Sequence, residues 1–192
     1  MKGGRHVLRL GKNVPVFSAL CMAVLFLAAT AGTGGAGDAA GLVGKNAPMF
    51  STIDLDGKPM QFAEVLQASS LVVLNFWGVR CGSCLEEMPH LSGMHARYLA
   101  QKVKILGVNV DGLEPAKLKS LLPQVAAVPP YPLLVDQDFK ITDLYAVSAA
   151  PLTFIVLPNG KIVYQHEGFT AGDERKLEEE IVKFLKSDAV GK

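Results

Sequence analysis

The segment from Leu71 to Pro89 constrains the fold more than any other part of the chain. It opens with the run Leu-Val-Val-Leu-Asn-Phe-Trp, which is typical of a strand buried on both faces. After Gly78, a helical pattern carries Cys81 and Cys84, three positions apart. This spacing places both sulfur atoms near the first turn of a helix, where unpaired N–H groups and the helix dipole favour a thiolate. The segment therefore predicts a dithiol suited to exchange.

The two cysteines are not equivalent in this pattern. Cys81 is expected at the helix N-cap with the positive charge of Arg80 beside it, so we expect it to be the exposed nucleophile. Cys84 lies one turn inside the helix and is expected to be the shielded, resolving thiol. Glu87 follows three residues later on the same helix face. It is the candidate acid–base group for the proton of Cys84.

Other chemistry of a cysteine pair is less well supported. A structural zinc site needs four ligands, and Cys21 is the only further cysteine of the sequence. Haem attachment needs a histidine directly after the second cysteine, where this chain has Leu85. A passive structural disulfide stays an alternative. We expect no metal and no bound cofactor, only a redox-active Cys81–Cys84 disulfide.

The N-terminal 40 residues predict export. Residues 1–13 carry four bases and no acid, residues 14–31 are almost wholly apolar, and a run of small residues follows. This order is typical of a secretory signal, although a stretch of 18 residues that is almost wholly apolar is also long enough for an uncleaved membrane anchor. Either interpretation places the domain of residues 41–192 on the extracytoplasmic or periplasmic side, the second with membrane contact. The whole chain has 19 basic and 18 acidic residues, a balance that does not favour nucleic-acid binding.

The remaining patterns predict an α/β domain with a mixed central sheet flanked by helices. Strands are expected at 50–55, 59–62, 71–76, 103–110, 133–135, 152–157 and 161–164, with hairpins at the first and last pairs. Helices are expected at 63–69, 81–101, 114–125, 139–145 and 174–186, the last with an acidic start and a basic end.

The motif Asn-Phe-Trp-Gly-x-x-Cys-x-x-Cys-x-x-Glu-x-Pro resembles the active-site segment of the thioredoxin superfamily, above all its exported TlpA/ResA-like branch. The resemblance covers about residues 42–187 and implies a thioredoxin-like fold. An N-terminal β-hairpin and a central helix–strand insertion, residues 113–135, are typical of that branch. The chain departs from the family at Arg80, where Trp is usual, and at Gly82-Ser83, where many members have a Pro.

The same resemblance implies further site residues. Pro151 matches the cis-proline that faces the dithiol, and the backbone of Ala150 before it would pair with an extended substrate. The family usually has Thr directly after this proline, where this chain has Leu152. Trp77 is either a core aromatic or a lid over the disulfide. We thus expect Trp77, Arg80, Ala150 and Pro151 to contact substrate.

These features together predict an exported thiol-disulfide oxidoreductase of the protein-disulfide reductase type. Cytochrome c maturation is the task that this branch most often serves, so apocytochrome c is an expected substrate. A membrane thiol protein is the expected electron donor. One alternative is a thiol peroxidase of the peroxiredoxin type, but that chemistry wants Thr or Ser three residues before the reactive cysteine, where Gly78 stands. The other is a non-catalytic module that binds a partner or a metal.

Overall fold

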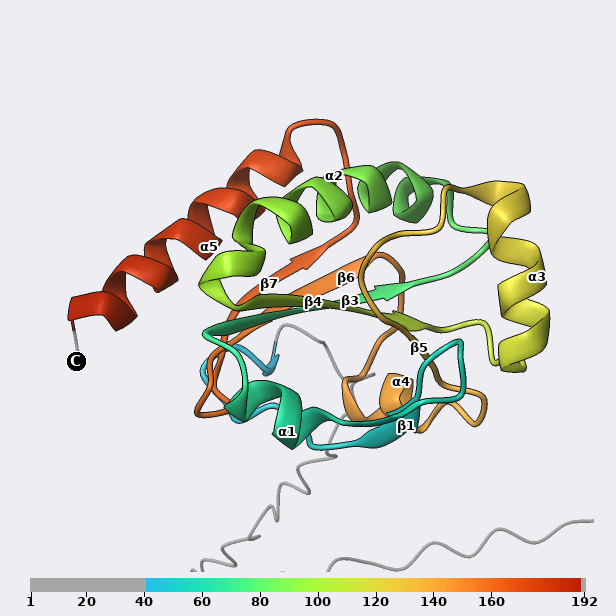
Figure 1. The fold of residues 1–192 in the computed structure, drawn as a ribbon, viewed down its shortest axis with the longest axis horizontal. Coiled ribbons are helices and arrows are strands. Elements are labelled where there is room, and N and C mark those ends of the chain that lie inside the picture. The colour runs from blue at the N-terminus through green and yellow to red at the C-terminus, as the bar shows by residue number, and fades with distance from the viewer. Residues whose placement is uncertain (1–40, 191–192) are drawn as a thin grey trace, which may run out of the picture. The chain divides into compact units, whose positions relative to one another are not determined.

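A five-stranded sheet forms the centre of the computed structural model, which describes residues 41–190 (Figure 1). The strands lie in the order β5-β4-β3-β6-β7. Their bounds are β3 Leu71–Trp77, β4 Val103–Asn109, β5 Leu133–Val135, β6 Leu152–Val156 and β7 Ile162–Glu167. Strands β3, β4 and β5 run parallel, whereas β6 is antiparallel to β3, and β7 is antiparallel to β6. The mixed sheet predicted from the sequence is confirmed.

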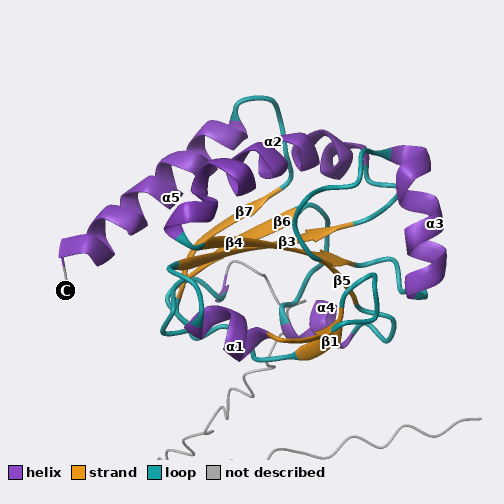
Figure 2. Ribbon diagram, in the orientation of Figure 1, coloured by secondary structure: helices purple, strands orange, loops and turns teal. Residues whose placement is uncertain are grey.

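Helices cover both faces of this sheet (Figures 1 and 2). On one face lie α2, Gly82–Tyr98, and α5, Asp173–Val190; on the other lie α1, Phe62–Gln67, and α4, Lys140–Leu144. A short 3₁₀ helix, Leu99–Gln101, extends α2. Helix α5 is longer than predicted, so its basic residues do not form its last turn.

Strand β3 supplies the core on both sides of the sheet. All seven of its residues are buried, and successive side chains point to opposite faces. Val72, Leu74 and Phe76 pack with α1 and α4. Leu71, Val73 and Trp77 pack with α2 and α5. This double burial explains why the strand is apolar almost throughout and why Asn75, its polar exception, needs a partner inside the domain.

The predicted N-terminal hairpin is a separate two-stranded sheet. Its strands are β1, Ser51–Ile53, and β2, Pro59–Gln61, paired antiparallel. The Leu55 N–H donates to the Leu133 carbonyl at 3.1 Å, and Asp54 forms a bridge with Leu134. The hairpin therefore covers the outer edge of β5, which would otherwise expose unpaired backbone groups.

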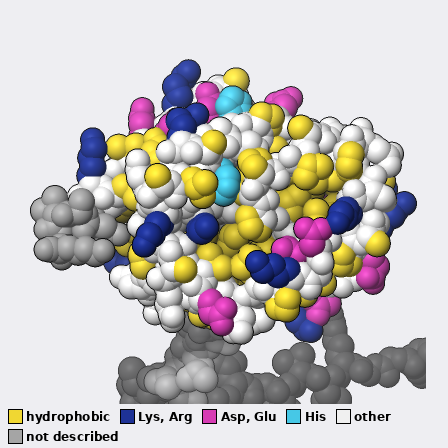
Figure 3. Space-filling view, in the orientation of Figure 1, with side chains coloured by type: hydrophobic (Ala, Val, Ile, Leu, Met, Phe, Trp, Pro, Cys, Tyr) yellow, Lys and Arg dark blue, Asp and Glu magenta, His cyan; other side chains and the backbone are white. Residues whose placement is uncertain are grey.

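The predicted insertion contains α3, Pro115–Val125, and ends in β5. Together with the hairpin it borders a hollow of about 390 Å³ with a largely apolar wall. In Figure 3, apolar side chains gather on this face between α3 and the hairpin. The wall includes Leu55, Leu122, Pro129, Tyr131 and Pro132.

The predicted signal or anchor, residues 1–40, lies outside the described residues. Between residues 41 and 190, no helix combines the length and the apolar character needed to cross a membrane.

Gly107 is required by the close approach of two neighbours in the sheet. A Cβ atom at this position of β4 would lie 2.7 Å from Leu133 Cδ2 and 3.2 Å from Trp77 Nε1. We expect Gly107→Ala to destabilise the domain by about 1–3 kcal/mol, the usual cost of overpacking. Urea unfolding of the oxidised protein measures this.

Gly93→Ala is the matched control for this substitution. Gly93 lies within α2, and its added Cβ would approach only the end of the Arg97 side chain, at 3.2 Å, and no backbone. We expect a gain of about 0.5–1 kcal/mol there, because Ala favours a helix over Gly. Equal effects of the two substitutions would contradict the assigned role of Gly107.

Candidate active site

Cys81 and Cys84 form a disulfide at the start of α2, with an S–S distance of 2.04 Å. Cys81 is the N-cap residue, and its Sγ accepts the N–H of Cys84 at 3.2 Å. The Ser83 hydroxyl lies 3.6 Å from the same sulfur. After reduction these donors and the helix dipole would all favour negative charge on Cys81.

The two sulfurs differ in access, as predicted. Cys84 is 1% exposed and belongs to the core cluster beneath α2. Cys81 is half-buried at the edge of that cluster. Cys81 is therefore the more accessible sulfur of the pair, and the roles of nucleophile for Cys81 and resolving thiol for Cys84 stay predictions.

Asp111 holds the loop that precedes the dithiol. Its Oδ2 accepts the Val79 N–H at 2.8 Å and the Asn109 side-chain amide at 2.6 Å. A Cβ at Gly78 would lie 3.2 Å from Asp111 Oδ1, so the close contact needs glycine. The sequence analysis missed this role of Asp111. The sequence signal that could have indicated this contact is an acid just after β4, because parallel neighbours such as β3 and β4 end at the same edge of the sheet.

The Ala150–Pro151 peptide bond is cis and faces the dithiol, which confirms the prediction. The carbonyl oxygen of Ala150 lies 3.4 Å from Cys81 Sγ. Pro151 is buried, and its carbonyl accepts the Gly168 N–H at 2.8 Å. Contact of Ala150 and Pro151 with a substrate stays a prediction.

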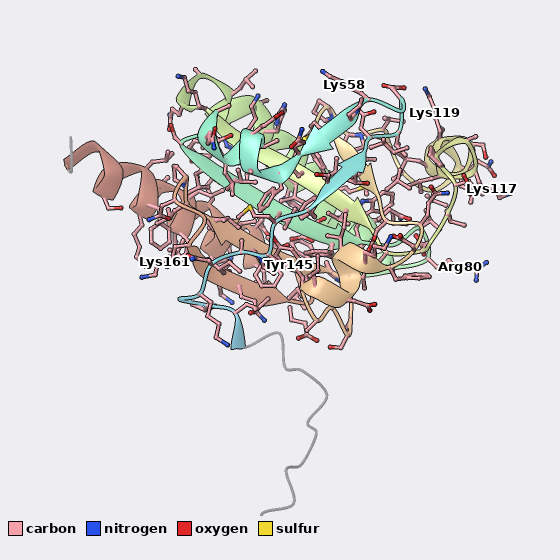
Figure 4. The ribbon with its side chains drawn as sticks, turned by 90° about the horizontal axis from the view of Figure 1, so that it is seen from below. Lys58, Arg80, Lys117, Lys119, Tyr145 and Lys161 are labelled. Atoms are coloured by element: carbon pink, nitrogen blue, oxygen red, sulfur yellow. A yellow bond between two sulfur atoms is a disulfide. The ribbon has the colours of Figure 1, made fainter. Side chains whose placement is uncertain are left out.

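The structure separates the other two residues expected to contact substrate. Trp77 is 0% exposed and packs in the same cluster as Cys84. Its assignment as a lid or substrate contact is therefore corrected: it is a core aromatic. Arg80 is exposed, and its side chain extends away from the domain (Figure 4). A role in binding substrate stays a prediction for Arg80.

Glu87 is a buried carboxyl group held by two polar side chains. It is 4% exposed. Its Oε2 accepts from Asn75 Nδ2 at 2.9 Å, and its Oε1 accepts from Thr153 Oγ1 at 3.2 Å. The Asn75 amide also donates to Thr153 Oγ1 at 2.9 Å, so the three side chains form a closed triangle between α2, β3 and β6.

Burial sets the protonation of this carboxyl group. It raises the pKa of Glu87 from the ordinary 4.5 to about 7, while the hydrogen bonds from Thr153 and Asn75 oppose the rise. The negative charge of Asp173 adds to it. A group that titrates near neutral pH can both accept and return a proton, as general acid–base chemistry requires.

Thr153 is a site residue that the sequence analysis missed. It lies opposite Asn75 across the β3–β6 pair. Two polar residues in otherwise apolar strands were the signal, but the pairing of those strands was needed to bring them together. The threonine that the family usually places directly after the cis-proline is Leu152 here, and the hydroxyl comes one residue later.

The described residues contain no group of three or more His, Cys, Asp and Glu side chains arranged to hold a metal ion.

The raised pKa of Glu87 predicts a stability that falls with pH. The folded domain keeps this proton more tightly than the unfolded chain, so the stabilisation is complete below about pH 4.5 and is lost as the pH rises through about 7. The loss amounts to about 3 kcal/mol. Between pH 4.5 and 8, we expect the free energy of unfolding of the oxidised Glu87→Gln variant, measured in urea, to decline by about 3 kcal/mol less than that of the wild type.

Glu86→Gln is the control, because Glu86 is the exposed neighbour on the same helix. It should retain the decline of the wild type. Parallel pH profiles for the wild type and Glu87→Gln would contradict the assigned protonation.

The difference in access predicts the order of alkylation. With limiting iodoacetamide, we expect the reduced protein to be labelled first at Cys81, because Cys84 is almost wholly buried. Mass spectrometry of the separated peptides measures this, with Cys21 scored on its own peptide. Labelling in urea should remove the preference. First labelling at Cys84 in the folded protein would reverse the two roles.

Comparison with known proteins bears on this site. Residues 43–165 match the AhpC/TSA family. The ResA thiol-disulfide oxidoreductase of Bacillus cereus is 32% identical over 121 residues, which are 63% of this chain and 67% of the relative. That of Halalkalibacterium halodurans is 30% identical over 146 residues, 76% and 78% of the two chains.

A solved structure is similar as well. The putative thiol:disulfide interchange protein DsbE of Chlorobium tepidum is 30% identical, with a TM-score of 0.67 over 74% of this chain and 97% of that one. The predicted thioredoxin-like fold and the ResA-like resemblance are thus confirmed. The chain belongs to the AhpC/TSA family and is a thiol-disulfide oxidoreductase, with the Cys81–Cys84 pair as the disulfide at the start of α2.

Proposed function

We propose that the protein is a reductase, which acts outside the cytoplasm on disulfides of other proteins. The observation that carries this proposal is the buried carboxyl group of Glu87, one helical turn after Cys84. In a reductase the resolving thiol must lose its proton within the folded domain. Glu87, with a pKa raised to about 7 by burial, is suited to take it.

The reaction then runs in two exchanges. The Cys81 thiolate attacks one sulfur of the substrate disulfide, the substrate S–S bond breaks, and the first substrate sulfur leaves as a thiolate. Glu87 takes the proton of Cys84, whose thiolate attacks Cys81 Sγ in the mixed disulfide. The second substrate thiolate leaves, so the substrate gains two electrons and the protein becomes the Cys81–Cys84 disulfide.

The carboxyl group of Glu87 also favours reduction of the substrate disulfide thermodynamically. Strong oxidants of this kind stabilise their reduced form through the thiolate. Glu87, one helical turn after Cys84, opposes this effect when it is ionised, because a like charge disfavours a thiolate. We expect the Cys81/Cys84 couple to have a potential below about −200 mV, toward the reducing end of the range for such domains.

The substrate class follows from the resemblance to the TlpA/ResA-like branch and from the surface beside Cys81. The half-buried Ala150 presents its backbone next to the reactive sulfur, where an extended peptide can add hydrogen bonds. We propose apocytochrome c, with its oxidised Cys-x-x-Cys-His segment, as a substrate. A membrane thiol protein on the same side would return the electrons. The basic and apolar start of the chain supports export and contact with the membrane.

The protein lacks the Thr or Ser hydroxyl that a thiol peroxidase of the peroxiredoxin type would need three residues before its reactive cysteine. The position three residues before Cys81 is Gly78, which is buried and has no side chain to offer. A non-catalytic module would not need a titrating carboxyl group behind its resolving cysteine.

The proposal predicts selective reduction of an oxidised Cys-x-x-Cys-His peptide by the reduced full-length protein. The control peptide has Ala in place of His, and hydrogen peroxide is the competing oxidant. We expect the His peptide to oxidise the protein at least about tenfold faster than either, since a well-recognised substrate gains more than 1.4 kcal/mol in the transition state. Mass spectrometry follows both thiol partners.

A trapping variant identifies the physiological substrate. Cys84→Ala lacks the resolving thiol, so mixed disulfides through Cys81 should accumulate in cells. Recovery of haem-binding cysteine proteins supports the proposal. Faster oxidation by peroxide than by either peptide, or a potential near that of strong oxidants, would overturn it.

A further inference from the structure

A small cavity lies beside Glu87. Its volume is about 10 Å³. Its wall comes from α2, β6, β7 and α5, together with Phe169 of the loop before α5. The polar residues of the wall are Glu87, His90, Thr153, His166, Asp173 and Glu174. A cavity of at least about 10–15 Å³ with two to four polar partners can hold one water molecule.

His166 of β7 lines this cavity. It lies opposite Thr153 across the β6–β7 pair, so it is next to the triangle that holds Glu87. Its Nε2 is buried and has no aligned hydrogen-bond partner among the described residues. The closest charged atom is Oδ2 of Asp173, at 3.3 Å. This contact is an ion pair when His166 is protonated, but it is not aligned as a hydrogen bond, so the N–H position of Nε2 is available to a water molecule in the cavity.

Asp173 is itself held firmly at the start of α5. Its Oδ2 accepts from the Thr170 N–H at 2.9 Å and from the Thr170 hydroxyl at 2.7 Å. Its Oδ1 accepts from Lys176 Nζ at 2.9 Å. The bond from Lys176 and those from Thr170 lower the pKa of Asp173 well below its usual range. Asp173 is therefore a permanent negative charge beside His166.

We propose that His166, paired with Asp173, carries the proton of Glu87 between the buried site and solvent by way of one water molecule in the cavity. The inference rests on the proposed role of Glu87. After Cys84 has given its proton to Glu87, the carboxyl group passes it to the water. The water passes a proton to His166 Nε2, and because Nε2 is buried, the imidazolium gives up a proton to solvent from its other ring nitrogen, since the His166 side chain is 29% exposed. Each transfer moves one proton, and the carboxylate is restored.

Other charged and titratable groups surround this path. Asp173 and Glu174 face it from α5, and His90 faces it from α2. Tyr131 and Tyr164 are close enough for the charge of Glu87 to raise the pKa of each phenol, although burial is the main cause for both. Histidine is the side chain suited to exchange protons near neutral pH, so His90 is the competing exit.

The test follows electrons and protons separately in one reaction. The reduced protein is mixed with an aromatic disulfide whose thiolates stay ionised at pH 8, so one proton is released for each dithiol oxidised. Trp77, the single tryptophan of the chain, lies in the same cluster as Cys84 and reports disulfide formation by fluorescence. A pH-indicator dye reports the proton. In the wild type, we expect the two signals to coincide.

His166→Gln should leave disulfide formation at the rate of the wild type and delay the proton signal by about tenfold or more, within the range of a lost acid–base group. His166→Ala should show the same lag, and added imidazole should remove it. His90→Gln is the matched control from the same cavity and should show no lag. The melting temperature and the reduction potential of the His166 variants should stay at the values of the wild type.

The outcomes separate this inference from the proposed function. Glu87→Gln should slow disulfide formation itself, and an unchanged rate there would remove Glu87 from the mechanism and the relay with it. Slow disulfide formation in Glu87→Gln with no proton lag in His166→Gln would overturn the relay alone. A lag in His90→Gln but not in His166→Gln would also overturn it, as would a lag that imidazole does not relieve.

Discussion

The burial of β3 on both faces is the constraint on which the rest of the structure depends. A strand with no exposed side needs a layer of helices on each face. Successive side chains of β3 point to opposite faces of the sheet, so one set packs against α1 and α4 and the other set packs against α2 and α5. Because α2 must return over the same strand, its first turn lies at the end of β3. The position of the dithiol is thus a consequence of how the centre of the sheet is covered.

The same burial gives the site its electrostatics. The odd-numbered residues of β3 face α2, and Asn75 among them meets Glu87 one turn past the resolving cysteine. A carboxyl group in this position loses the hydration that would keep it ionised, which raises its pKa. The domain is less stable at high pH as a result, and it gains a carboxyl group that titrates near neutral pH away from bulk solvent. At Cys81 the effect is opposite, because the N–H groups at the start of the helix favour the ionised thiolate rather than the neutral thiol.

Much of this could be predicted from the sequence, because the informative patterns are local. The apolar run of β3, the CxxC at the helix start and the alternating strands of the N-terminal hairpin each identify one element without knowledge of the others. The triangle, the Asp111 contact and the His166 cavity depend instead on the pairing of distant strands. Thr153 is 66 residues from Glu87, and no periodicity places one against the other. Trp77 was ambiguous for a related reason, since an aromatic at the end of a buried strand faces either core or solvent.

The closed triangle of Asn75, Glu87 and Thr153 also limits how the site can change over time. The Thr153 hydroxyl accepts from the amide and donates to the carboxyl group, so loss of any one member leaves a buried polar atom without a partner, at a cost of about 1–3 kcal/mol. Exchange of all three for apolar residues of similar volume would avoid that penalty but would remove the acid–base group. The three side chains are therefore coupled: a change at one of them is costly unless the other two change with it.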